Sequence, residues 1–124
     1  MLIGTEIWPS KDAWENKVLF LETCEDEVLP DYLKYYLRNL IAQGIIDKIN
    51  GIIIGKPQNE KYYEEYKEVY KNVIGGEANR SKLPILYNVN IGHTAPMCIF
   101  PLGQKIKVDL NKKEIIFLEK PMRD

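Results

Sequence analysis

Short apolar runs and amphipathic stretches alternate along this chain, and the alternation limits its fold more than any other feature. The apolar runs at 18–21 and 52–54 are bounded by charged or turn residues, as strands buried on both faces are. Stripes of apolar residues over 31–43 and 60–74 have helical spacing, and a third strand is expected over 84–89. Strands that alternate with helices pair in parallel through right-handed crossovers, so the sequence predicts an α/β fold.

A β-hairpin is expected after the alternating part of the chain. Apolar and polar residues alternate over 106–110 and again over 115–117, on either side of Asn111-Lys112-Lys113. A period of two is typical of a half-buried antiparallel pair. The predicted fold is therefore α/β with a mixed sheet, two helices and a C-terminal β-hairpin, which extends the sheet or packs beside it.

Particular residues are expected to set the ends of the two helices. Asp31 follows Pro30, and an aspartate side chain can cap free backbone N–H groups at a helix start. Gly44 is placed to end the first helix in a left-handed conformation. Gly75-Gly76 is expected to end the second helix.

Composition indicates a single domain that needs no metal or disulfide to fold. The 124 residues include 17 basic and 18 acidic side chains, and the net charge of −1 excludes the positive footprint of a nucleic-acid-binding protein. There is no run of about 18 apolar residues and no secretion leader, so a cytoplasmic protein without membrane or nucleic-acid partners is expected. Cys24 and Cys98 suit reduced, partly buried thiols rather than a zinc site.

His93 is the only histidine, and is therefore the first candidate for proton transfer near neutral pH. It follows Gly92 just beyond the third predicted strand, where open α/β sheets form active sites. Glu22 ends the first predicted strand, so parallel strands would project Glu22 and His93 from the same edge. A carboxylate that accepts the Nδ1 proton of histidine fixes its tautomer, as the acid of a hydrolytic triad does. On spacing alone, a solvated charge at a strand end explains Glu22 equally well.

A nucleophile for this pair is missing from the sequence. Ser10 and Ser81 lack the flanking glycines of a nucleophile elbow. Cys98 has apolar neighbours, which disfavour the thiolate that a thiol nucleophile needs. The acids at 25–27 lack the alternating pattern of a calcium loop, so a solvated loop is expected there.

Five short motifs, taken in order, resemble the C-terminal domain of the LD-carboxypeptidase and microcin C self-immunity (MccF-like) serine peptidases. They are Gly4-Thr5-Glu6-Ile7-Trp8-Pro9, Val18-Leu-Phe-Leu-Glu22, Gly51-Ile-Ile-Ile-Gly55-Lys56-Pro57, Gly92-His93-Thr94 and Pro101-Leu102-Gly103. The set covers nearly the whole chain. Lys56-Pro57 and the tyrosine- and glutamate-rich helix after it are more similar to the immunity branch than to the murein branch.

The resemblance implies that residues 1–124 are a swivelling β/β/α-type domain of a two-domain enzyme. In this family an N-terminal domain, absent from these residues, carries the nucleophilic serine and the oxyanion hole. By motif, Glu22 and His93 are the catalytic residues of the C-terminal domain, and residues 1–16 are the interdomain connecting segment. The family implies no metal or other cofactor, and a homodimer that hydrolyses an amide bond of a murein tetrapeptide or of a peptidyl- or aminoacyl-nucleotide.

Three functions stay open at this point. The first is the C-terminal half of a serine carboxypeptidase-like hydrolase, which is inactive alone because its nucleophile is absent. The second is a non-catalytic assembly or binding module that kept the hydrolase fold. The third is a thiol hydrolase that uses Cys98. For the first function, the acidic loop at 22–31 and Lys56 are candidates for lining the specificity pocket.

Overall fold

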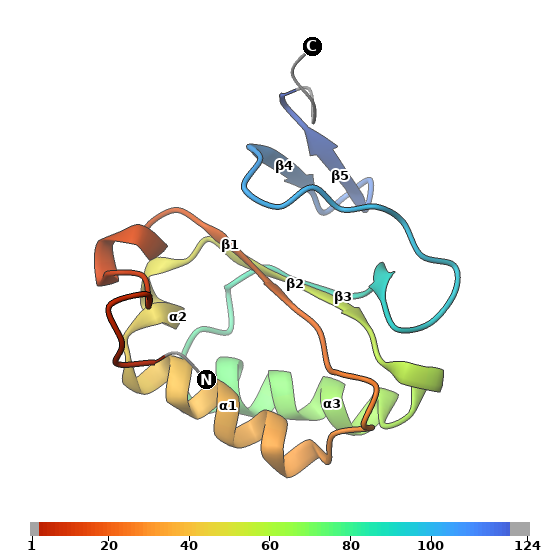
Figure 1. Ribbon diagram of the computed structural model, residues 1–124, viewed down its shortest axis with the longest axis horizontal. Helices are drawn as coiled ribbons and strands as arrows, with labels where there is room; N and C mark the ends of the chain where they lie inside the picture. The colour runs from red at the N-terminus through yellow and green to blue at the C-terminus, as the bar shows by residue number, and fades with distance from the viewer. Residues whose placement is uncertain (1–2, 120–124) are drawn as a thin grey trace.

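The protein is built in layers, with a parallel sheet in the middle (Figure 1). The computed structural model describes residues 3–119. Helices α1 (Pro30–Ala42) and α3 (Tyr63–Tyr70) cover one face of the sheet. A hairpin of β4 (Ile106–Asp109) and β5 (Glu114–Phe117) lies over the opposite face. The predicted α/β class with a C-terminal hairpin is confirmed.

The sheet places β2 between two parallel neighbours. β1 (Val18–Leu21) pairs with β2 (Gly51–Lys56), and β2 pairs with β3 (Ile85–Gly92). Every residue of β2 is buried, whereas β1 is an edge strand and is mostly half-buried. The expectation that both apolar runs are buried on both faces therefore holds for the central strand and is wrong for β1.

The main core lies between the sheet and the helices, because alternate strand side chains point toward α1 and α3. Leu37 of α1 and Ile74, which follows α3, are fully buried against Ile52 and Ile54 of β2. Ile53, between those two, faces the hairpin side instead. The helical stripe predicted from the leucine spacing is thus the face that covers the sheet, and its burial supplies most of the driving force for folding.

The helix ends agree with the sequence expectations only in part. Leu29 is the N-cap of α1 and Pro30 its first residue, so Asp31 lies inside the first turn and does not cap it. Gly44 has a φ of 73° between α1 and the short α2 (Ile45–Lys48), as the left-handed helix end requires. A π-helical turn, Lys71–Glu77, continues α3 through Gly75 and Gly76, so these glycines do not end the helical segment.

The hairpin is a separate two-stranded antiparallel sheet, not an extension of the parallel one. Three aromatic rings connect the two sheets. Phe20 of β1 stacks on Phe100 with 5.6 Å between ring centroids, and Phe100 meets the edge of Phe117 at 5.3 Å. The hairpin is thus held to the sheet by side-chain packing on one face rather than by strand pairing.

The N-terminal segment packs on the domain instead of running free. Trp8 and Trp14 lie 5.6 Å apart between ring centroids, and both pack against the core. Lys48 at the end of α2 pairs with Asp12 at 3.3 Å and Glu15 at 3.1 Å. Over residues 3–119, no helix is both long and apolar enough to cross a membrane.

Both cysteines are free and exposed. The expectation of partly buried thiols is therefore wrong. Cys24 lies on the loop after β1 and Cys98 on the segment between β3 and the hairpin, where neither side chain reaches the core.

The buried tyrosines between helix and sheet predict a loss of stability at high pH. Burial raises the pKa of the Tyr70 phenol above its usual range of about 10, so ionisation is easier in the unfolded chain. The stabilisation is complete below about pH 10 and is lost as pH rises above it. We expect Tyr70→Phe to reduce the fall in unfolding free energy between pH 9 and pH 11 by about 1 kcal/mol, measured by urea titration. Tyr32→Phe, at an exposed position, is the matched control, and equal pH slopes for the two variants would contradict the expectation.

Candidate active site

Glu22 and His93 reach the same place from opposite sides of β2. Glu22 follows the last residue of β1, and His93 follows the last residue of β3. Because β1 and β3 are both parallel neighbours of β2, their carboxyl ends meet at one edge of the sheet. Neighbouring strands lie about 4.8 Å apart, so the two backbones are roughly 10 Å apart and the side chains must bridge β2.

The structure brings the two predicted side chains together. Glu22 Oε2 lies 3.5 Å from His93 Nδ1, an ion-pair distance if the ring is protonated. Nδ1 is buried and has no hydrogen bond within the described part of the chain. The pair is therefore in contact but not in hydrogen-bonding geometry. Apo catalytic sites often have such long contacts.

Two glycines leave room for this contact. A Cβ on Gly55 of β2 would lie 2.8 Å from the carbonyl oxygen of Ile91 and 3.4 Å from Glu22 Cβ. Gly92 ends β3 with a φ of 107°, and a Cβ there would lie 2.6 Å from the carbonyl oxygen of Lys56. Gly55 and Gly92 thus allow the close approach of β2 and β3 where the side chains of Glu22 and His93 meet.

Backbone contacts hold the turn that carries the histidine. The His93 amide donates to the carbonyl oxygen of Lys56 at 3.0 Å, and the Thr94 hydroxyl donates to that of Pro57 at 2.6 Å. The Gly-His-Thr motif is therefore fastened to the end of β2 on both sides of His93. A backbone fixed at His93 suits a side chain that must transfer protons along one direction.

Substitution of Gly92 is expected to be strongly destabilising. Gly92→Ala combines a positive φ with a backbone clash that no side-chain rotation can relieve, so we expect a loss of at least about 2 kcal/mol of unfolding free energy. Urea denaturation of the chain measures it. Gly76→Ala is the control, because nothing lies within 4 Å of a Cβ there. An equal effect of the two substitutions would contradict the role given to the turn.

The acidic loop after β1 is solvated, as its sequence predicts, but one of its acids also contacts His93. Glu25 Oε1 lies 3.4 Å from His93 Nε2, so one imidazole ring contacts two carboxylates. Glu27 pairs with Lys61 at the start of the segment that leads into α3. Sequence reasoning missed the Glu25 contact because a loop has no periodicity that predicts where its side chains point.

Within 3–119, no group of three or more His, Cys, Asp and Glu side chains is arranged to hold a metal ion.

The other residues considered as nucleophiles do not reach the pair. Ser10 is exposed beside the 3₁₀ turn Lys11–Trp14, and Ser81 is exposed before β3. Among the residues described, neither they nor Cys98 forms a hydrogen bond or ion pair with Glu22 or His93, and the Cys98 amide donates to the carbonyl oxygen of Asn90 at 2.7 Å. Among residues 3–119, the pair of Glu22 and His93 thus has no serine or cysteine side chain in contact with it.

Lys56 is the one buried charged residue of the part of the chain that the structure describes. It ends β2 directly beside Gly92, but its ammonium makes no ion pair within that part. A buried lysine without an anionic partner is costly, which makes Lys56 a candidate for meeting an anion from outside the chain.

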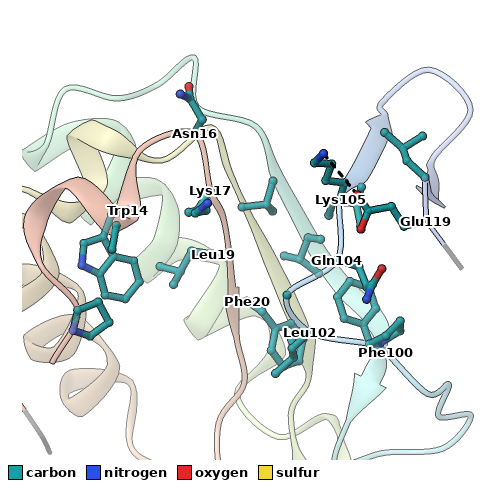
Figure 2. A pocket seen from close by; sticks show the side chains of 18 residues that line it. Trp14, Asn16, Lys17, Leu19, Phe20, Phe100, Leu102, Gln104, Lys105 and Glu119 are labelled. Atoms are coloured by element: carbon teal, nitrogen blue, oxygen red, sulfur yellow. Dashed lines mark ion pairs between the residues drawn. The ribbon is translucent and has the colours of Figure 1, made fainter. Parts of the chain in front are cut away.

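Figure 2 shows a groove at another place in the structure. It has a volume of about 780 Å³, and Trp14, Phe20, Phe100 and Leu102 are among the residues that line it. Lys105 and Glu119 form a 3.4 Å ion pair at its rim. The described residues that line this groove do not include Glu22 or His93, which lie instead at the open edge of the sheet.

The sequence matches one protein family over most of its length. Residues 1–108 match the family described as the LD-carboxypeptidase C-terminal domain. A putative carboxypeptidase of Treponema pallidum is 28% identical over 113 residues, which cover 91% of this chain and 32% of the relative. The microcin C7 self-immunity protein MccF of Escherichia coli is 25% identical over 118 residues, 93% of this chain and 33% of the relative.

Solved structures of MccF and of an MccF-like protein are also similar to this chain. An MccF-like protein from Streptococcus pneumoniae, crystallised in complex with AMP, has a TM-score of 0.82 and 38% identity over 90% of this chain and 31% of that one. MccF in complex with glutamyl sulfamoyl guanosine has a TM-score of 0.72 and 25% identity, over 98% of this chain and 35% of that one. The chain thus spans about a third of the length of the proteins it resembles.

Proposed function

Because the chain belongs to the LD-carboxypeptidase C-terminal domain family, we propose that it supplies the glutamate and histidine of a Ser-His-Glu hydrolytic triad. His93 acts as general base toward a serine carried by another domain, and later gives the proton to the leaving amine. Glu22 holds the ring by its Nδ1 side and stabilises the imidazolium. The observation that carries the proposal is the 3.5 Å contact between Glu22 and His93.

The solvent exposure of Glu22 and His93 supports a nucleophile that is supplied by another domain. His93 and Glu22 lie at the sheet edge with side-chain exposures of 22% and 38%, so a second domain can reach both of them. Just beyond His93, the apolar side chains of Met97, Ile99 and Leu102 are exposed, and Ile99 is 97% exposed. An apolar surface beside a half-built site favours contact with another protein segment. The proposed partner is the nucleophile-bearing N-terminal domain.

The substrate we propose is an aminoacyl- or peptidyl-nucleotide rather than a murein tetrapeptide. The support is the similarity to the MccF-like proteins, of which the Streptococcus pneumoniae protein was crystallised with AMP and MccF with a glutamyl sulfamoyl nucleoside. Lys56, buried at the same edge and without an anionic partner in the described chain, is the candidate contact for a negative charge of such a substrate.

A chimera tests the proposed function. The chain is grafted in place of the matching segment of the Streptococcus pneumoniae MccF-like protein, which its 38% identity allows. Hydrolysis of an aminoacyl-sulfamoyl nucleoside and of a murein tetrapeptide is then compared for the chimera and for the isolated chain. We expect the chimera alone to be active, and on the nucleotide analogue. Activity of the isolated chain that iodoacetamide abolishes would favour the thiol hydrolase with Cys98 instead.

The binding-module function stays as the second candidate, favoured by the exposed apolar side chains at 97–102. It predicts that the isolated chain self-associates and that no chimera is active. Sedimentation of the chain before and after Ile99→Ser measures this. The family resemblance also implies a homodimer of the complete protein, which the same method measures on the chimera.

A further inference from the structure

The imidazole of His93 lies between two carboxylates of one loop. Glu22 contacts Nδ1 at 3.5 Å and Glu25 contacts Nε2 at 3.4 Å. The two acids differ in their surroundings, since the side chain of Glu22 is 38% exposed and packs over Gly55, whereas that of Glu25 is 75% exposed. Glu22 is therefore held in place, while Glu25 can turn away from the ring at little cost.

The loop that carries Glu25 is fastened on both sides of that residue, because Tyr66 hydrogen-bonds with the Thr23 side chain before it and with the Val28 carbonyl oxygen after it. Glu27 also pairs with Lys61. Asp26 has the Cys24 thiol as its neighbour, at 3.9 Å. Of the three consecutive acids at 25–27, Glu25 alone reaches His93.

We propose that Glu25 is a removable partner of His93, which covers Nε2 and holds the ring until the nucleophile takes its place. The inference rests on the proposed function, in which Nε2 is the nitrogen that accepts the proton of the nucleophile. A carboxylate 3.4 Å from Nε2 pairs with the ring when the ring is protonated, and it fills the space where a hydroxyl would lie. Glu25 must therefore leave before the base can work, and its exposure allows that movement.

Chemical modification of the isolated chain tests the inference without any catalysis. Diethyl pyrocarbonate acylates an unprotonated imidazole nitrogen, and His93 is the only histidine, so ultraviolet absorbance follows this one ring. The rate is measured across pH, and its plateau at high pH reports access to the neutral ring separately from its protonation. We expect Glu25→Ala to raise the plateau about fivefold, which corresponds to about 1 kcal/mol, because the neutral ring then has no side chain beside Nε2.

Matched variants separate this effect from a general change in the loop. Asp26→Asn removes a charge one residue away and should leave the plateau unchanged, and Glu25→Asp should give an intermediate rate. An unchanged plateau for Glu25→Ala, or an equal rise for Asp26→Asn, overturns the inference.

The active chimera gives a second readout. Glu25→Gln is expected to keep kcat/KM at or above the parent value, because it removes a competitor for Nε2. A loss as large as that of His93→Ala would make Glu25 part of the reaction and overturn its role as a removable partner. If instead the chimera with His93→Ala stays active, the proposed function fails while the modification result still stands on its own.

Discussion

Replacing His93 with alanine in the active chimera is expected to lower kcat/KM by about 10³- to 10⁶-fold, because the nucleophile loses its general base. The loss should appear in kcat, since the proton moves in the transition state and not on binding. Steady-state hydrolysis of the aminoacyl-sulfamoyl nucleoside measures it. Rescue by imidazole separates the loss of the base from structural damage. Added imidazole should restore part of the rate when only the base is missing, and it should restore none when the site is misfolded.

Two controls make the His93 result specific. Thermal unfolding of His93→Ala should resemble that of the parent, because the ring lies at the sheet edge and outside the main core. Thr94→Val removes the 2.6 Å bond to Pro57 and loosens the same turn without touching the ring. A loss for Thr94→Val as large as that for His93→Ala, or no rescue by imidazole, would contradict a role of His93 in proton transfer.

Glu22→Gln is expected to lower kcat/KM by about 10²- to 10⁴-fold. The amide keeps the shape of the side chain but cannot stabilise the imidazolium, and it offers a donor as well as an acceptor to Nδ1. The same hydrolysis assay measures the loss, and Asp26→Asn, an exposed acid of the same loop, is the control. Near-full activity of Glu22→Gln would leave Glu22 as a solvated charge at a strand end.

Much of this site could be predicted from the sequence because parallel strands impose it. Once the runs at 18–21 and 85–92 are parallel strands of one sheet, Glu22 and His93 must lie at the same edge. The sequence does not say that β2 lies between them, so it does not predict that the side chains must bridge a strand at Gly55.

Other parts of the structure depend on contacts that have no sequence period. Glu25 lies on an irregular loop, and the sequence of consecutive acids does not predict which of them contacts His93. The sequence allows the hairpin either to extend the sheet or to pack beside it. In the structure it packs, through the stacking of Phe20 on Phe100. The π-helical turn through Gly75 and Gly76 likewise overrides the usual preference of glycine for helix ends.

The double variant Glu22→Gln/His93→Ala in the chimera tests most directly whether these two residues act as one unit. Residues that act together are strongly non-additive, since the second loss removes nothing further once the first has occurred. We predict that kcat/KM of the double variant equals that of His93→Ala within a factor of about three. If the fold-loss in kcat/KM of the double variant were instead the product of the two single fold-losses, the account would be contradicted.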